Sequence, residues 1–488
     1  MPKKQPIADN GPLKNTTARN IAVNGLFAFT HGKNRIQETL DTIFRLHQSD
    51  SLTKTQATEL AYGTCRYLIT LDHLIGKYSS RPLRGIDAAV VHILQVALYQ
   101  MIYHNQSHDF AVVNEAVNQA KQYQQRAGAF VNAILRSVQR DMEGLVTAGD
   151  ENLNHQAILW LNGEQGRLFK TSILADRTKN PAKYYSVAFS YPLWLTQRWL
   201  KTFDKDTVLR ICTAGNARPL PSLRVNSLWG SVEKLQGLLD SAGVKTISKE
   251  SALLPQQPIT PSQLPGYDEG AFYVQDITAM SAAPLLNPQP GQKILDLCAA
   301  PGGKSTHLGQ LMNNQGTIIA CDLDQQKLDV IKENCKRLGV TIVQTCTPDE
   351  LDALSKQYGP FDAALVDVPC SNTAVLARRV EARHLLKPIH IQRNSNTQYH
   401  LLEKASWLVK DGGHILYSTC SIEPAENNLL IKKFLQNNPK ATILQEKLTL
   451  PEVAVSAEAN APATDPAHIY SYHDGGYTAL IEMRSAQG

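Results

Sequence analysis

The sequence predicts a multidomain protein in which a helical N-terminal region precedes a doubly wound α/β domain built on a mainly parallel sheet. The chain has 488 residues, which is more than one hydrophobic core usually serves. Apolar residues recur at helical spacing in the first third of the chain. From about residue 275 onward, short apolar runs alternate with helical stretches, the pattern of a parallel sheet.

The N-terminal region, residues 1–145, is predicted to be all-helical. Its apolar residues follow a helical period between Thr17 and Arg140, and no alternating strand pattern occurs there. Four segments resemble the transcription antitermination factor NusB and its relatives: Glu59–Gly63, Leu98–Gln100, Val113–Val117 and Phe130–Arg136. The resemblance implies an RNA-binding helical bundle. The Asn, Tyr and Gln residues in these segments equally suit helix capping, so we assign no site there.

Residues 146–185 are predicted to be a linker or an insertion, because periodicity is lost and Gly, Asn, Gln and Lys accumulate. Residues 186–275 begin with a helical stretch, in which we expect Trp194 and Trp199 to belong to the core. A proline-rich extended segment then brings Arg224 and Asn226, which we predict to contact RNA. This region resembles the small α+β RNA-binding domain that precedes the catalytic domain in ribosomal RNA cytosine methyltransferases.

The C-terminal region, residues 276–488, supplies the strands of the predicted sheet. In parallel α/β sheets, ligands bind at the carboxyl ends of the strands. The strand candidates are Ile294–Leu297, Thr317–Asp322, Ala363–Asp367, His414–Tyr417 and Thr478–Met483.

The first of these strands runs into a glycine-rich turn and then a helix, over Asp296–Ser305. Two adjacent glycines let a ligand approach the backbone, and the helix start offers free amide donors. A P-loop is excluded because Cys298 stands where its first glycine is required, and the Gly-x-Gly-x-x-Gly pattern of dinucleotide folds is absent. The remaining interpretation is S-adenosylmethionine, with Asp322 placed at the ribose hydroxyls.

The string Asp-Leu-Cys-Ala-Ala-Pro-Gly-Gly-Lys-Ser is similar to the cofactor motif of RNA cytosine-carbon-5 methyltransferases. The resemblance implies a Rossmann-like domain that binds S-adenosylmethionine. One departure stands out: the family usually has an aspartate after the third strand, whereas this chain has Val343–Cys346 and only then Asp349. The implied cofactor-binding residues are Cys298, Ala299, Ala300, Pro301, Gly302, Gly303, Lys304, Asp322 and Asp367.

Two cysteines stand at strand ends, Cys370 after Pro369 and Cys420 within Thr419–Ser421. Methylation of carbon 5 of cytosine requires a thiolate to add to carbon 6, an acid to charge the ring and a base to remove the carbon 5 proton. The pair resembles the Pro-Cys and Thr-Cys-Ser motifs of the same enzymes. The resemblance implies that Cys420 is the nucleophile and that Cys370 assists product release. Asp367 is expected to hydrogen-bond the protonated ring nitrogen.

After Pro-Cys-Ser, which ends here at Ser371, the family usually has a glycine or alanine, a threonine and a glycine, whereas this chain has Asn372–Ala374. The basic residues beyond it, Arg378, Arg379 and Arg383, are candidates for contacts with RNA phosphates. We expect His307, His384 and His414 to be structural, and His473–Tyr477 to form a hairpin turn before the last strand.

The composition of the chain bears on its cellular location and on its partners. No signal peptide and no run of about 18 apolar residues is present, so we expect a cytoplasmic protein without a membrane partner. The eight cysteines are scattered without a Cys-x-x-Cys pair, which favours free thiols and no metal site. The net charge of +5 is compatible with local nucleic-acid contact.

The order of these parts resembles bacterial small-subunit ribosomal RNA cytosine methyltransferases. The resemblance implies methylation of a cytosine in 16S ribosomal RNA, free or in an assembly intermediate, and suggests the equivalent of cytosine 967. The base must be unpaired or flipped out of its helix. Two alternatives stay open: a noncatalytic RNA-binding protein with a degenerate methyltransferase domain, and a transfer RNA methyltransferase.

Overall fold

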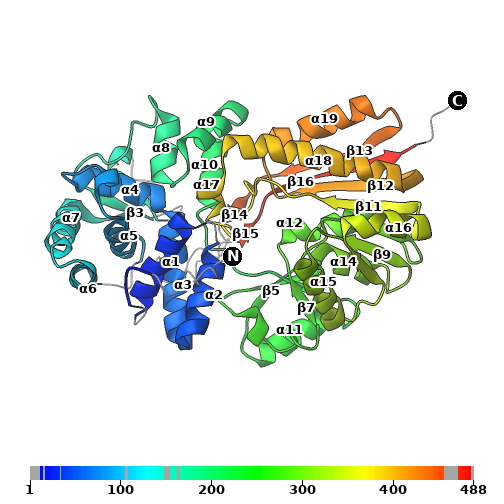
Figure 1. Ribbon diagram of the computed structural model, residues 1–488, viewed down its shortest axis with the longest axis horizontal. Helices are drawn as coiled ribbons and strands as arrows, with labels where there is room; N and C mark the ends of the chain where they lie inside the picture. Colours follow the sequence, from blue (N-terminus) through cyan, green and yellow to red (C-terminus); the bar gives the residue numbers. More distant parts are fainter. Residues whose placement is uncertain are drawn as a thin grey trace, which may run out of the picture. The chain divides into compact units, whose positions relative to one another are not determined.

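The computed structural model describes residues 11–14, 17–32, 35–104, 108–147, 154–161, 165–454 and 471–484. Two compact units divide the chain (Figure 1). The helical unit comprises residues 1–216 together with Arg383–Leu385, and the catalytic-domain unit comprises the rest of the chain.

The helical unit begins with a bundle, as the sequence predicts. Side chains at the helix starts satisfy free backbone N–H groups: Thr17 accepts from Asn20 N, and Asp50 accepts from Thr53 N. The fifth helix is buried on nearly all sides and forms the centre of the bundle. The seven helices are α1 (Ala18–His31), α2 (Ile36–His47), α3 (Ser51–Arg66), α4 (Leu68–Tyr78), α5 (Ala88–Tyr103), α6 (Asp109–Tyr123) and α7 (Ala127–Asp141).

The predicted linker contains regular structure. A three-stranded antiparallel sheet, in the order β1-β3-β2, is formed by β1 (Met142–Thr147), β2 (Ile158–Trp160) and β3 (Gln165–Phe169). A sheet was not expected in this region, because its strands are short. Three further helices follow: α8 (Pro181–Ala188), α9 (Leu193–Thr202) and α10 (Lys205–Ala214). Trp199 of α9 is buried, which confirms its expected place in the core.

The catalytic-domain unit opens with a small α+β part. Its antiparallel sheet has the order β5-β6-β4-β7, and α11 packs on this sheet through Leu235 and Leu239. The predicted extended segment is β4, which lies in the interior of this sheet between β6 and β7. The elements are β4 (Leu223–Val225), α11 (Val232–Ser241), β5 (Thr246–Lys249), β6 (Ala252–Pro255) and β7 (Phe272–Val274).

The main sheet has seven strands in the order β10-β9-β8-β11-β12-β16-β13. The pairs among β8 to β12 are parallel, whereas β16 runs antiparallel to both β12 and β13. This arrangement confirms the mainly parallel sheet. The strands are β8 (Lys293–Leu297), β9 (Thr317–Cys321), β10 (Val343–Cys346), β11 (Phe361–Asp367), β12 (Val409–Thr419), β13 (Ala441–Thr449) and β16 (Gly476–Met483).

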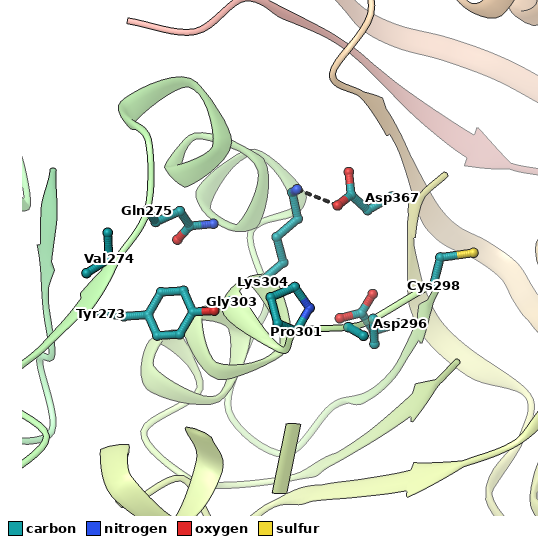
Figure 2. A pocket seen from close by; sticks show the side chains of 11 residues that line it. Tyr273, Val274, Gln275, Asp296, Cys298, Pro301, Gly303, Lys304 and Asp367 are labelled. Carbon is teal, nitrogen blue, oxygen red and sulfur yellow. Dashed lines mark hydrogen bonds and ion pairs between the residues drawn. The ribbon is translucent and has the colours of Figure 1, made fainter. Parts of the chain in front are cut away.

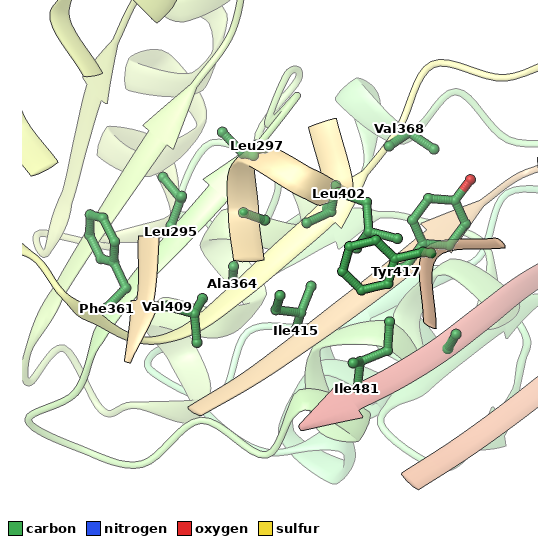
Figure 3. Close-up of a cluster of buried hydrophobic side chains, with 14 of the residues drawn as sticks. Leu295, Leu297, Phe361, Ala364, Val368, Leu402, Val409, Ile415, Tyr417 and Ile481 are labelled. Carbon is green, nitrogen blue, oxygen red and sulfur yellow. The ribbon is translucent and has the colours of Figure 1, made fainter. Parts of the chain in front are cut away.

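Helices cover both faces of this sheet, as Figure 1 shows for α14 and α15 on one side and α18 and α19 on the other. Successive strand residues point to opposite faces. Ile294 packs with Leu308 of α14, whereas its neighbour Leu295 lies in the core cluster that contains Leu402 of α18 (Figure 3). The helices are α12 (Ile277–Met280), α13 (Ala282–Leu286), α14 (Gly303–Leu311), α15 (Gln325–Leu338), α16 (Pro348–Tyr358), α17 (Ala382–Leu385), α18 (Pro388–Leu408) and α19 (Asn428–Asn437).

The end of the chain departs from the predicted hairpin. A turn does lie at Asp474–Gly475, but β15 (Ser471–His473) pairs with β14 (Glu452–Ala454) and not with β16. The last strand instead pairs with β12 and β13. The hairpin prediction was wrong because a glycine-rich turn shows where the chain bends and not which strands then pair.

Candidate active site

The loop after β8 takes conformations that require its glycines. Gly302 has φ +94°, in the left-handed region that disfavours side chains. A Cβ atom on Gly303 would lie 2.8 Å from a ring carbon of Tyr273. Gly303 begins α14, and the backbone N–H of Ala300 donates to Asp322 at the end of the neighbouring strand at 3.1 Å. Two strand ends are thus joined around the turn.

This loop forms one side of a pocket at the carboxyl edge of the sheet. Figure 2 shows Lys304 in its middle, with Tyr273 and Gln275 on one side and Asp296, Cys298 and Asp367 on the other. Seven of the nine predicted cofactor-binding residues line it, while Gly302 and Asp322 do not. The lining residues are Tyr273, Val274, Gln275, Asp296, Cys298, Ala299, Ala300, Pro301, Gly303, Lys304 and Asp367.

Four of the lining residues were not among the predicted cofactor-binding residues: Tyr273, Val274, Gln275 and Asp296. The first three come from the end of the small α+β part, which no motif in the sequence linked to the cofactor turn. Asp296 opens the recognised string and could have been proposed, since a carboxylate in an apolar strand needs a partner.

Asp296 is fully buried and only partly satisfied. Its Oδ2 accepts from Ser305 Oγ at 2.5 Å, whereas its Oδ1 has no hydrogen-bond partner among the described residues. Burial raises the pKa of this carboxyl to about 7, and the negative charge of Asp367 acts in the same direction. A ligand with a positively charged amino group would satisfy the free oxygen and favour the ionised form. The pocket therefore fits such a ligand.

Lys304 and Asp367 form an ion pair in the same pocket, with Nζ and Oδ2 2.6 Å apart. Burial alone would lower the pKa of Lys304, but the charge of Asp367 and the hydrogen bond between the two raise it above its ordinary value. The other oxygen of Asp367 accepts from Ser418 Oγ at 2.5 Å, so this carboxylate lies between the cofactor turn and strand β12, which ends one residue before Cys420.

Asp322 lies beside the pocket and is nearly buried. It accepts hydrogen bonds from the backbone of Ala300 and Leu323, and its contact with Lys327 Nζ is 3.3 Å. On the adjacent strand, Cys346 is paired in register with Cys321, and its thiol is buried. Asp349, which the sequence left as a loose match for the missing aspartate, is exposed on α16.

The two cysteines predicted to react lie together. Cys370 Sγ and Cys420 Sγ are 2.9 Å apart, although the residues are 50 positions apart in the sequence. They follow the ends of the neighbouring parallel strands β11 and β12. The hydrogen bond with Cys420 raises the pKa of Cys370 well above its ordinary value, and burial adds to this effect. Cys370 therefore holds its proton.

Asn372 explains how the chain does without the usual glycine after Pro-Cys-Ser. Its φ is +59°, the left-handed conformation that asparagine tolerates better than most residues. Its side-chain Oδ1 accepts a hydrogen bond from Cys420 Sγ at 3.2 Å. The substitution thus keeps the backbone turn and adds a polar contact to the thiol.

Three residues that we predicted to contact RNA are buried, so these predictions were wrong. Arg224 is fully buried and donates to Gly303 O at 2.5 Å and to Thr306 Oγ1 at 3.1 Å. Asn226 donates to the carbonyls of Gly270 and Leu338. Arg383, also fully buried, donates to Gly215 O at 2.7 Å within the helical unit. Their polar groups serve the chain's own carbonyls instead of phosphate.

The remaining arginines divide in the same way. Arg378 is held by Asp276 and Asp474, each 3.0 Å away, whereas Arg379 is exposed and stays a candidate for RNA contact. The structural interpretation of two histidines is confirmed by burial. Burial lowers the pKa of His307 to about 3 and that of His384 to about 4. His384 Nε2 is also hydrogen-bonded to Cys65 O.

Within the described ranges, no group of three or more His, Cys, Asp or Glu side chains is arranged to hold a metal ion. None of the helices described is both long enough and apolar enough to cross a membrane.

The fold and the pocket place the chain in the class of Rossmann-like methyltransferases, and comparisons with known proteins agree. Three family models match: the NusB family over residues 16–140, the RsmF/B-like ferredoxin-like domain over 191–259, and 16S rRNA methyltransferase RsmB/F over 283–480.

Two relatives and one solved structure extend the match to most of the chain. The probable ribosomal RNA small subunit methyltransferase B of Synechocystis sp. is 32% identical over 452 residues, covering 91% of this chain and 94% of the relative. Ribosomal RNA small subunit methyltransferase B of Escherichia coli O127:H6 is 32% identical and covers 80% and 84%. The crystal structure of PH0851 matches with a TM-score of 0.69 and 25% identity over 96% of this chain and 99% of that one. The chain belongs to the family of ribosomal RNA small subunit methyltransferases B.

Proposed function

We propose that the protein transfers a methyl group from S-adenosylmethionine to carbon 5 of a cytosine in 16S ribosomal RNA, through a covalent bond between Cys420 and the base. The observation that carries the proposal is the contact of two thiols, 2.9 Å apart, at the ends of strands β11 and β12. Asp367, which ends β11, also lines the pocket that fits a cofactor. The names of the relatives support the choice of 16S ribosomal RNA.

The pocket and its immediate surroundings supply groups for the amino group and the ribose of the cofactor. The free Oδ1 of Asp296 is placed for an amino group, and the turn of Pro301–Gly303 allows close approach to backbone. Asp322, beside the pocket, is the candidate for the ribose hydroxyls. When bound, S-adenosylmethionine supplies a methyl group that is activated by its attachment to a positively charged sulfur.

Cys420 begins the reaction on the base. Its thiolate adds to carbon 6, a carbon–sulfur bond forms, and the electrons of the carbon 5–carbon 6 double bond are displaced into the ring. The ring nitrogen takes up a proton from solvent as electrons reach it, and Asp367 supports this step by accepting a hydrogen bond from the protonated nitrogen. Carbon 5 then becomes nucleophilic and takes up the methyl group.

Cys370 assists the last step. After a solvent water molecule, acting as the base, has taken up the carbon 5 proton, the electrons of that carbon–hydrogen bond restore the double bond and expel the sulfur of Cys420. The proton of Cys370 lies within hydrogen-bond distance of this sulfur and can pass to it as the carbon–sulfur bond breaks. A raised pKa of Cys370 suits a group that must still carry its proton at this stage.

The test incubates the protein with labelled S-adenosylmethionine and 16S ribosomal RNA, beside the Cys420→Ala and Cys370→Ala variants. We expect 5-methylcytosine with the unaltered protein, a loss of at least about a thousandfold with Cys420→Ala, and protein trapped on RNA with Cys370→Ala. Bisulfite sequencing then tests whether the modified base is the equivalent of cytosine 967.

Two other outcomes would replace the proposal. Methylation of transfer RNA in preference to 16S ribosomal RNA would indicate a transfer RNA enzyme. RNA binding without cofactor binding or methyl transfer would indicate a noncatalytic RNA-binding protein.

A further inference from the structure

Glu426 is a buried carboxylate behind the two cysteines. Its side chain is fully buried and accepts hydrogen bonds from five neutral donor groups. On one side are Ser371 N at 3.0 Å and Ser371 Oγ at 2.5 Å, and on the other is Ser421 Oγ at 2.5 Å. Asn394 Nδ2 at 3.0 Å and Gln398 Nε2 at 3.3 Å, both from α18, complete the set.

The two serines that donate to Glu426 are the sequence neighbours of the two cysteines. Ser371 directly follows Cys370, and Ser421 directly follows Cys420. One carboxylate therefore holds the residues next to both thiols, although they belong to loops that leave different strands. The two serine hydroxyls also lie 3.0 Å from each other, so the loops are joined directly as well as through Glu426.

The residues on the other side of each thiol are fixed by the same cluster. Gln398 Nε2 donates to the carbonyl of Pro369, which precedes Cys370, at 2.9 Å. Thr419, which precedes Cys420, donates to Asn427 Oδ1 at 2.7 Å, and Asn427 donates to Ser421 O at 2.9 Å. Each cysteine is thus held at both neighbours, which leaves little freedom in the distance between the thiols.

We propose that Glu426 is the positioning residue of the two-cysteine centre, holding the Cys370 and Cys420 loops in the arrangement that methyl transfer requires. This inference rests on the function proposed above for the two cysteines. Glu426 lies outside the residues that line the pocket, so its role is to act through the loops and not on the cofactor.

The charge of Glu426 adds a second effect. Among the residues that the structure describes, no Lys, Arg or His donates to this carboxylate, and the donors found there are all neutral groups. Its negative charge opposes ionisation of Cys370 and contributes to the raised pKa of that thiol. The same residue thereby helps to keep Cys370 as the thiol.

The test replaces the carboxylate by its neutral isostere, Glu426→Gln, with Glu426→Asp as the conservative variant. Glutamine offers one acceptor oxygen and brings its own N–H donors toward the serine hydroxyls. We expect kcat to fall by roughly a hundredfold, the scale of a small misplacement of reacting groups, with KM for both substrates within about threefold of wild type. Glu426→Asp should restore part of kcat.

A second readout needs neither cofactor nor RNA. Alkylation of each cysteine by iodoacetamide, followed by peptide mass spectrometry across a range of pH, reports the ionisation of Cys370 and Cys420 separately. We expect the midpoint for Cys370 to move to lower pH in Glu426→Gln. The matched control is Glu446→Gln on β13, which also removes a carboxylate that accepts from a hydroxyl, that of Tyr477, and should change neither kcat nor the alkylation profile.

The outcomes separate the two proposals. If the wild-type protein does not methylate, the proposed function fails, while an unchanged alkylation profile in Glu426→Gln would still count against the role of Glu426. If the wild type methylates and Glu426→Gln keeps full kcat, the positioning role is overturned. Should Glu426→Gln not fold, Asn394→Ala removes one donor only, and we expect it to lower kcat by severalfold; an unchanged kcat there overturns the inference equally.

Discussion

Asp296 and Glu426 are both fully buried carboxylates near the carboxyl edge of one sheet, yet their surroundings differ. Asp296 accepts one hydrogen bond from Ser305 and leaves its Oδ1 unsatisfied toward the pocket. Glu426 accepts from five neutral donors and lies outside the pocket lining. An unsatisfied buried carboxylate is costly unless a ligand completes it, whereas a satisfied one makes its neighbourhood rigid. The first arrangement suits binding and the second suits positioning.

The largest expected effect is on the pH dependence of stability. The pKa of Asp296 is about 7 in the folded chain, against about 4 in an unfolded one, so the folded state binds the extra proton between these values. The contribution of this carboxyl to stability is fully present below about pH 4 and is lost as the pH rises through about 7. As the pH rises from about 5 to about 8, the raised pKa of Asp296 should lower the free energy of unfolding of the cofactor-free protein by about 3 kcal/mol.

Urea unfolding of wild type and Asp296→Asn at these two pH values measures this effect. The variant should gain in stability relative to wild type as the pH rises. If the stability of the two proteins depended on pH in the same way, the raised pKa of Asp296 would not be the source of the predicted loss of stability. Glu426→Gln should instead be less stable than wild type at both pH values, because glutamine offers the five donors one acceptor oxygen in place of two and brings N–H donors of its own toward the serine hydroxyls.

Cofactor affinity should distinguish the two carboxylates next. Asp296→Asn removes the charge that we propose to hold the amino group of S-adenosylmethionine, and a hydrogen bond between charged groups contributes about 1.5 to 3 kcal/mol. We therefore expect the dissociation constant to rise by roughly 10- to 100-fold in titration calorimetry. Glu426→Gln should bind the cofactor within about threefold of wild type. Equal losses in both variants would erase the distinction between binding and positioning.

A smaller effect is expected from the serine donors. Ser305→Ala removes the one donor seen on Asp296, whereas Ser421→Ala leaves four donors on Glu426. The first change should lower stability by about 2 kcal/mol at about pH 8, and the second by about 1 kcal/mol or less. Thermal unfolding of both variants measures the difference. A larger loss for Ser421→Ala would show that donors in the Glu426 cluster cannot replace one another.

The smallest effect concerns an exposed charge. Arg379→Ala should weaken binding of 16S ribosomal RNA by less than about 1 kcal/mol and reduce the slope of log affinity against log salt by about 1. Lys410→Ala, which removes an exposed lysine paired with Asp362 at the start of β12, is the control and should change neither. Filter binding at several salt concentrations measures both. No change in the salt slope for Arg379→Ala would remove it from the RNA contacts.

The bundle and most of the main sheet could be predicted because each of their elements has a local pattern of apolar residues. The helical period located the bundle, and the apolar runs located five strands of the main sheet. Strand β13 was missed because most of its residues are polar and exposed, so it carries no apolar run. The strands of the small sheet β1-β3-β2 are similarly short and carry no clear alternation.

The arginines show where sequence patterns stop being informative. Arg224 and Arg383 stand in segments that look suited to RNA, but both are buried and bound to carbonyl groups. A guanidinium group serves phosphate and carbonyl oxygens equally well, and only the fold decides which it meets. The same holds for Glu426, whose place behind both cysteines depends on two loops that lie far apart in the chain.

The antiparallel strand β16 has a consequence for the order of events during synthesis. It inserts between β12 and β13, and its Tyr477 is paired with Thr419, the residue before Cys420. Strand β12 therefore obtains its outer neighbour only after the ribosome has translated the codons up to Met483. A nascent chain that already contains both cysteines still lacks β16, the strand that supports the end of β12 before Cys420. The site of the two cysteines can therefore be completed only after most of the other helices and strands have been synthesised.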